Sequence, residues 1–194
     1  MDLTTIITER RSIRRFNSRS VSQELVTELL AKAVRLYGQS ESPRVRFVYA
    51  GTPEARERLV DGMTSSMREN KLMRWVPGKM IELFKSRFTA IPGHLIVVAE
   101  ADPDRRGEED SVAAACGIMQ IFQLLGWEQG LGMLWDTERI IQNEVFFKQI
   151  GIRDPEVFVG ILHIGYFDKA PRGRSRTPAE KKWTVYEGRE ARTV

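Results

Sequence analysis

One apolar stretch, Asp110 to Trp135, places the strongest constraint on how this chain can fold. Between Val112 and Trp127 apolar residues occupy every face of a helical wheel, and a helix that is apolar all round is buried all round. Ser111, which follows acidic residues, is expected to cap this helix, and Gly130 to Gly132 are expected to end it ahead of a short buried strand. Polar residues interrupt the apolar run before it reaches the roughly 20 residues of a bilayer span. The stretch therefore predicts the core helix of a soluble protein, placed so that a second subunit can share it.

Composition is that of a globular protein. The chain has 194 residues, of which 42% are hydrophobic and 29% charged, enough for a single domain over 1–194 with no linker. A formal net charge of +4 favours a small anionic ligand over a nucleic acid, whose binding proteins gather basic residues along one face. The single cysteine, Cys116, excludes an intrachain disulfide, and together with the lack of an apolar signal region it predicts a cytoplasmic protein with no membrane partner.

Hydrophobic periodicity predicts helices and strands on both sides of the central helix. The expected helices are Asp2–Arg11, a helix after the capping box Ser20–Gln23, Glu54–Glu69, and one that Asp136 or Thr137 caps and Gly151 ends. The expected strands are Arg46–Ala50, His94–Ala99 and Val157–Tyr166, in which Gly160 indicates a close backbone approach. The basic, aromatic stretch Asn70–Phe88 fits either a flap over a ligand or ordinary core packing.

Four arginines and a hydroxyl lie between Arg10 and Arg15. Guanidinium groups can grip a phosphate in bidentate fashion, and the hydroxyl of Ser12 can add a shorter hydrogen bond. Ile13 and Phe16 alternate with these polar residues and can anchor them to the core. The pattern predicts an anion site, with a solvated basic turn as the alternative.

Side chains that perform chemistry by themselves are scarce in this sequence. The only histidines, His94 and His163, lie within apolar strands, where a satisfied core residue is the commoner role, and no Cys or His has the spacing of a metal ligand. Cys116 lies in the apolar helix, where a buried thiol is inert, and neither a nucleophile elbow nor a phosphate-cradling glycine loop is present. Two basic clusters beside a large apolar core therefore indicate a bound cofactor that carries the reaction.

Taken in order, these motifs resemble the nitroreductase family of FMN-dependent oxidoreductases. The resemblance lies in the Arg10–Arg14 cluster, the Gly38–Phe47 loop and strand, the Ala-rich central helix, Gly130–Trp135, and Val159–Gly165 with the basic tail that follows. No single motif is specific, whereas their order and spacing are. Pro43–Arg46 departs from the family's usual segment at that place, and Thr52–Phe88 matches no family motif.

The resemblance implies an FMN site without a catalytic side chain or a metal. Arg10 and Ser12, helped by Arg11, would hold phosphate and ribityl oxygens, and Arg14 would lie near the pyrimidine edge of the ring, where a cation stabilises negative charge. The strand through Leu134, Trp135 and Asp136 would line the ring. The partner subunit would contribute Arg35 and Gln39, and Arg176, with Arg174 as the alternative, would bind the phosphate.

The implied fold is α+β and nitroreductase-like: a mixed central sheet flanked by helices, with the long buried helix at the interface of a homodimer. The implied activity is ping-pong electron transfer from NADH or NADPH to a nitroaromatic, a quinone or a similar small electron-poor acceptor. One alternative is other flavin chemistry on the same fold, such as reductive dehalogenation or substrate oxidation. A nucleic-acid-binding module is the more distant alternative, since no recognisable binding motif or aromatic platform is present.

Overall fold

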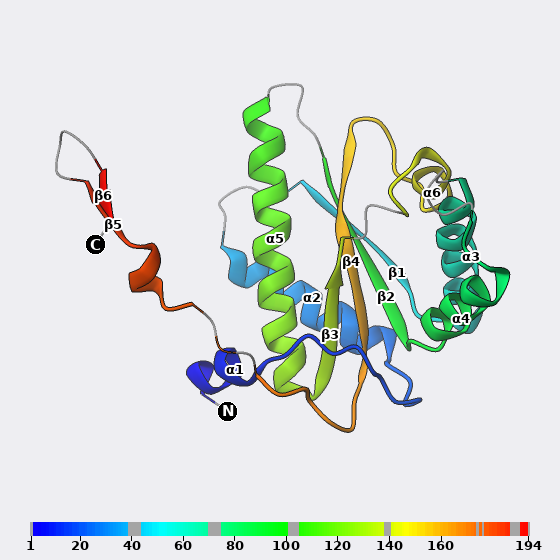
Figure 1. Ribbon diagram of the computed structural model, residues 1–194, viewed down its shortest axis with the longest axis horizontal. Coiled ribbons are helices and arrows are strands. Elements are labelled where there is room, and N and C mark those ends of the chain that lie inside the picture. The colour runs from blue at the N-terminus through cyan, green and yellow to red at the C-terminus, as the bar shows by residue number, and fades with distance from the viewer. Residues whose placement is uncertain are drawn as a thin grey trace.

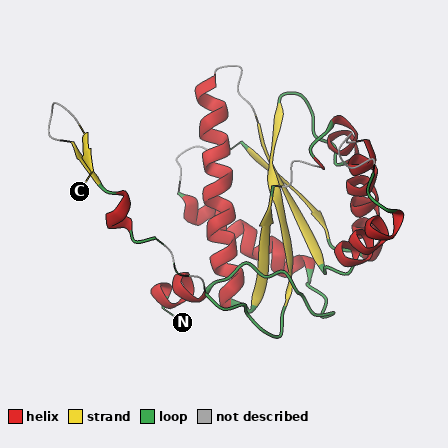
Figure 2. Ribbon diagram, viewed as in Figure 1, coloured by secondary structure: helices red, strands yellow, loops and turns green. Residues whose placement is uncertain are grey.

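A four-stranded sheet lies between two groups of helices in the computed structural model (Figure 1). The structure describes residues 2–38, 44–69, 75–100, 105–137, 141–173, 175, 177–186 and 191–193. The helices are α1 (Leu3–Glu9), α2 (Gln23–Tyr37), α3 (Pro53–Glu69), α4 (Gly78–Thr89), α5 (Arg105–Glu128) and α6 (Glu144–Gln149), and the strands are β1 (Val45–Ala50), β2 (Gly93–Glu100), β3 (Leu131–Asp136), β4 (Glu156–Tyr166), β5 (Thr184–Tyr186) and β6 (Ala191–Thr193). Figure 2 shows the sheet between its two helical layers and confirms the α+β class.

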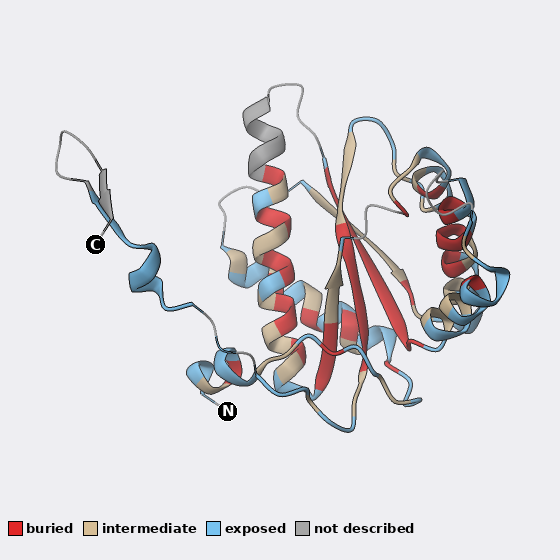
Figure 3. Cartoon of the chain, viewed as in Figure 1, coloured by how far each residue is buried: buried red, intermediate tan, exposed pale blue. Residues whose placement is uncertain are grey.

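The order of the main sheet is β1-β2-β4-β3, and each neighbouring pair is antiparallel. Parallel pairing within the described residues is limited to an isolated bridge between Ser12 and Met133. The central strands β2 and β4 are the most deeply buried, because helices cover both of their faces (Figure 3). This agrees with the nearly continuous apolar sequence of both strands.

Helices α2 and α5 cover one face of the sheet. Their side of the core contains Val26, Leu29, Ala115, Ile118, Met119 and Phe122 from the helices and Leu95, Val97, Leu131, Met133, Leu162 and Ile164 from the strands. Gly117 allows the close contact between the two helices, since an added Cβ would overlap the ring of Tyr37.

Helix α5 differs from its sequence-based prediction in two ways. It begins at Arg105, so the predicted cap at Ser111 is wrong, because the preceding arginine and glutamate residues are themselves good helix formers. Its burial is also one-sided: Phe122 is fully buried, whereas Ala113 and Gln120 are exposed. Within the described residues, the side of α5 turned away from the sheet is therefore only partly covered.

Helices α3, α4 and α6 lie on the opposite face of the sheet (Figure 1). Their core contains Leu59, Val60, Met63, Met67 and Phe146 from the helices and Ile96, Val98 and Ile161 from the strands. The predicted cap of α6 at Asp136 or Thr137 is wrong, because β3 continues through Asp136 and the side chain of Asn143 accepts from the Phe146 amide instead, at 3.1 Å. Gly151 follows the helix at a φ of 70°, as the predicted end requires.

The cap of α2 also differs in position. Ser22 accepts from the Leu25 amide at 3.1 Å, two residues beyond the predicted start of the capping box. Gly38 ends the helix in the left-handed region, at a φ of 71°.

Beyond β4 the chain leaves the sheet and passes α1, and the pair β5–β6 lies apart from the rest (Figure 1). Trp183, which precedes β5, is 62% exposed. Within the described ranges, no helix combines the length and apolar character that crossing a bilayer requires.

Candidate functional site

The N-terminal segment crosses the end of the sheet and is fixed to it at two points. The Ile13 amide donates to the Met133 carbonyl at 3.0 Å, and the Asn17 amide donates to the Tyr166 carbonyl at 2.8 Å. Since the first bond is to β3 and the second to the end of β4, residues 14–16 are held across the sheet between these two points.

A pair of glycines makes room for this crossing. Gly132 in β3 and Gly165 in β4 are partners in the strand register. An added Cβ on Gly132 would overlap the side chain of Ile13, and one on Gly165 would lie 2.8 Å from the ring of Phe16. The crossing therefore requires glycine at both positions.

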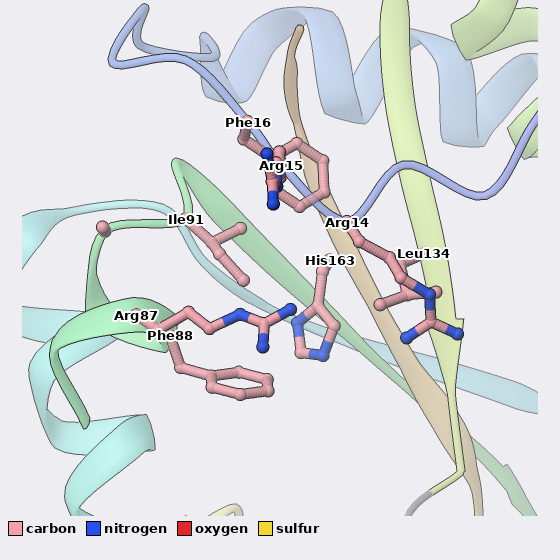
Figure 4. A pocket seen from close by; sticks show the side chains of 9 residues that line it. Arg14, Arg15, Phe16, Arg87, Phe88, Ile91, Leu134 and His163 are labelled. Carbon is pink, nitrogen blue, oxygen red and sulfur yellow. The ribbon is translucent and has the colours of Figure 1, made fainter. Parts of the chain in front are cut away.

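A pocket of about 380 Å³ opens beneath the crossing segment, within the usual size range of small-molecule sites. Its lining consists of Arg14, Arg15 and Phe16 from the crossing segment, Leu134 and His163 from the sheet, and Arg87, Phe88, Ala90 and Ile91 from the end of α4 and the loop that follows. Figure 4 shows His163 projecting between Phe88 and Leu134, with Arg14 and Arg87 on opposite sides. These nine described residues include three guanidinium groups and no carboxylate, so the lining favours anionic groups.

His163 lines this pocket, and His94 lies beside it. His94, His163 and Leu134 are register partners across β2, β4 and β3. The Nδ1 atoms of the two histidines are 2.7 Å apart, and the His94 Nε2 atom is 3.1 Å from the Phe88 carbonyl oxygen. Neither ring has solvent exposure. Burial, and secondarily the charge of His163, lowers the pKa of His94 to about 3.

Asp136 lies next to His163 on the side opposite His94, so the three side chains form a row. Its Oδ2 atom is 3.4 Å from His163 Nε2, a separation at which charges interact but the geometry does not make an aligned hydrogen bond. The Asp136 side chain is 18% exposed, so it connects the buried histidines to the surface of the molecule.

The structure brings several of the sequence-predicted site residues together. Arg14 and Leu134 line the pocket, and Ser12 forms the bridge to Met133 beside them. The Trp135 side chain belongs to the core on the α5 side of the sheet, so only its main chain can face the pocket. Its indole lies on Gly160, where an added Cβ would be 2.5 Å from Nε1, which confirms the predicted close approach.

Arg10 and Arg11 lie at the end of α1. Arg10 is the C-terminal cap residue, and its amide donates to the Ile6 carbonyl. Arg11 Nη1 donates to the carbonyl oxygens of Thr8 and Arg10, at 2.5 and 2.9 Å. An added Cβ on Gly173 would lie 2.7 Å from Arg11 Nη2, so the chain beyond β4 passes against this guanidinium.

Arg35 is exposed in the last turn of α2 and is not part of the pocket of this chain. The predicted residues Gln39, Arg174 and Arg176 lie outside the described residues.

Seven of the nine lining residues were not among the predicted cofactor-binding residues: Arg15, Phe16, Arg87, Phe88, Ala90, Ile91 and His163. His163 was expected in the core, Arg15 and Phe16 in the basic cluster and its anchor, and Arg87 and Phe88 in the stretch with two open interpretations. A polar residue inside an otherwise apolar strand was the available signal for His163. The end of α4 at the pocket favours the ligand-facing interpretation of that stretch.

Other reactive groups do not gather at a second centre in the described part of the chain. No cluster of three or more His, Cys, Asp or Glu side chains is placed there to hold a metal ion. Cys116 is partly buried in α5, and burial raises the pKa of its thiol, which disfavours the reactive thiolate.

Comparison with known proteins identifies the family of this fold and site. The family model described as the nitroreductase family matches residues 7–166. The protein called "Putative NAD(P)H nitroreductase YfhC" of Bacillus subtilis (strain 168) is 30% identical over 182 residues, which are 94% of this chain and 93% of that protein. A nitroreductase-like family protein from Bacillus cereus shares 35% identity, with 97% of each chain covered and a TM-score of 0.86. An FMN-dependent nitroreductase from Clostridium difficile R20291 has the same fold at 18% identity, with a TM-score of 0.66 over 96% of this chain and 99% of that one. The chain therefore belongs to the nitroreductase family.

Proposed function

We propose that this protein is an FMN-dependent oxidoreductase that takes two electrons from NADH or NADPH and passes them to a nitroaromatic, a quinone or a similar electron-poor molecule. The observation that carries the proposal is the fixed crossing segment, which holds Arg14 over the same pocket that Leu134 and His163 line from the sheet. The family assignment and the name of the Bacillus subtilis relative support the same reaction class.

The residues present fit FMN. Leu134 and Phe88 give the pocket apolar walls for a planar ring, and Arg14 adds the cation that stabilises negative charge on it. The main chain of Leu134, Trp135 and Asp136 would lie along the ring. Bound FMN would supply the two-electron redox chemistry, which no side chain of the pocket can perform alone.

The ribityl and phosphate groups would extend toward the end of α1, where Arg10, Arg11 and Ser12 would hold them. Arg11 lies against the chain at Gly173, and Arg174 and Arg176 follow Gly173 closely in the sequence. We propose that Arg176, or else Arg174, adds a further guanidinium to the phosphate. Oxidised nicotinamide would leave before the acceptor enters, which makes the kinetics ping-pong.

We also propose that the protein acts as a homodimer through the side of α5 turned away from the sheet. Cys116, Ile121 and Leu124 on this helix are only partly buried in one chain, and Leu3, Ile7 and Leu36 of α1 and α2 are 64%, 54% and 59% exposed. Apolar area of this kind is typical of an obligate interface. Arg35 and Gln39 would then reach the partner's FMN. A single domain over 1–194 and a cytoplasmic location, inferred from the lone cysteine, complete the proposal.

The test is to titrate the purified protein with FMN and to follow NADH or NADPH oxidation with a nitroaromatic acceptor. We expect a yellow complex and steady turnover. Arg14→Gln should weaken FMN binding about tenfold, the value of one charge-assisted contact of ~1.4 kcal/mol. Arg68→Gln, at the far end of α3, is the matched control and should bind as the wild type does. A protein that binds no flavin would refute the proposal, and bound FMN without acceptor turnover would favour other flavin chemistry.

A further inference from the structure

His94, His163 and Asp136 form a row of side chains beneath the pocket. The contact at the His94 end determines which nitrogen atoms in this row carry a proton. A carbonyl oxygen only accepts, so His94 Nε2 carries the proton that it donates to Phe88. Because burial keeps His94 neutral near pH 7, its Nδ1 atom has no proton and must accept. The donor in the 2.7 Å contact is therefore His163 Nδ1.

At the other end of the row, the contact between His163 and Asp136 then requires one more proton. If His163 were neutral with its proton on Nδ1, the lone pair of its buried Nε2 would face the Asp136 carboxylate 3.4 Å away. Two acceptor atoms that face each other with no proton between them are unfavourable in a buried place. A proton on either atom turns the repulsion into an attraction, so the His163–Asp136 pair holds one exchangeable proton at the pocket wall.

Charged groups of both signs surround this pair. The titratable and charged groups that face the row are His94 on β2, Asp136 on β3, Arg56 on α3, Arg87 on α4 and Arg14 on the crossing segment. Negative charge that enters the pocket would favour the protonated form of the pair.

We propose that the His163–Asp136 pair is a redox-linked proton site, which binds its proton more tightly while electrons reside in the pocket and gives it to the acceptor as they leave. The inference rests on the proposed function. Reduction of a quinone to a hydroquinone consumes two electrons and two protons, and NADH or NADPH supplies both electrons with one proton as hydride. The second proton comes from the pair: its N–H or O–H bond breaks, an O–H bond of the hydroquinone forms, and a hydronium ion or buffer acid of the bulk solvent reprotonates the pair.

The first test measures the midpoint potential of the FMN-loaded protein from about pH 5 to about pH 9, the range in which a histidine pair titrates. A proton linked to a two-electron couple adds about 30 mV per pH unit to the slope. We expect that contribution in the wild type and its loss in His163→Phe, which keeps an aromatic ring beside Phe88, and in Asp136→Asn. His94→Asn retains an acceptor for His163 Nδ1 and should keep the contribution. Equal slopes in all four proteins would overturn the inference.

The second test needs no substitution in the pair. The chain has two histidines, so nitrogen NMR of the labelled wild type gives two imidazole patterns, which His94→Asn assigns. We expect His94 to remain neutral with its proton on Nε2, and the proton occupancy of His163 Nε2 to rise when the FMN-loaded protein is reduced. A proton occupancy of His163 Nε2 that is the same in both redox states refutes the inference alone. Failure of the protein to bind FMN at all instead refutes the proposed function.

Discussion

Replacement of His94 should make the stability of the protein less sensitive to acid. The pKa of His94 falls from its ordinary value of 6.5 to about 3 in the fold, mainly because the ring is buried. Between these pH values the His94 ring is therefore protonated in the unfolded chain and neutral in the folded chain. Stability from this residue is complete above pH 6.5 and is lost as the pH falls toward 3.

The magnitude follows from linkage. With a pKa of 6.5 in the unfolded chain and about 3 in the fold, the free energy of unfolding should fall by roughly 2–3 kcal/mol between about pH 6 and about pH 4. His94→Asn removes the titrating group while its side-chain oxygen can still accept from His163. The free energy of unfolding of the variant should be lower than that of the wild type at the upper end of this pH range, because the hydrogen bond to the Phe88 carbonyl is lost. Its decrease across the range should be smaller than that of the wild type by the same amount, roughly 2–3 kcal/mol.

Urea unfolding followed by tryptophan fluorescence at pH 6, 5 and 4 measures this difference by linear extrapolation. Protein concentration must be constant, since an oligomer gains apparent stability with concentration. Ile96→Val, a substitution at a buried position of the same strand, controls for a general loss of stability and should keep the wild-type pH dependence. If His94→Asn and Ile96→Val have the same pH dependence, His94 is not held neutral by the fold and the proton assignment in the row fails.

Two further substitutions test how local structure supports the site. Gly160→Ala should cost about 1–3 kcal/mol in urea unfolding, because the new Cβ would lie 2.5 Å from the Trp135 indole nitrogen. Gly78→Ala, where an added Cβ meets nothing within 4 Å, should cost nothing, and equal losses would contradict the proposed overlap. Ser22→Ala should lower the melting temperature of the protein through a loss of about 1 kcal/mol at the start of α2, whereas Ser22→Asp should preserve the cap. A similar loss in both variants would show that the hydroxyl does not act as the cap.

Sequence periodicity predicted the elements of this fold well where one pattern dominates. The expected ranges of β2, β4 and α3 each lie within a residue or so of the observed ones, because continuous apolar runs and single helical faces leave little choice of structure. The starts of α5 and α6 were harder to predict. Charged residues ahead of Ser111 suit both a cap region and a helix, and the fold decides between them.

The site was predictable only in part, because its geometry depends on strand pairing over long distances in the sequence. Arg14 and Leu134 were identified through the family resemblance, and both line the pocket. His94 and His163 are 69 residues apart, and each looks like an ordinary core residue in its own strand. Only the register of β2 with β4 makes them a pair, and no local pattern contains that register.

Two main-chain hydrogen bonds fix the crossing segment to the sheet. Its attachment therefore does not depend on the side chains that face the ligand. Neither the Ile13 bond to Met133 nor the Asn17 bond to Tyr166 uses a side chain. Positions 14–16 can therefore change in charge and size while the backbone that presents them remains in place. A combinatorial library confined to positions 15 and 16, which leaves Arg14 in place for FMN, would be a direct way to redirect the protein toward new acceptors.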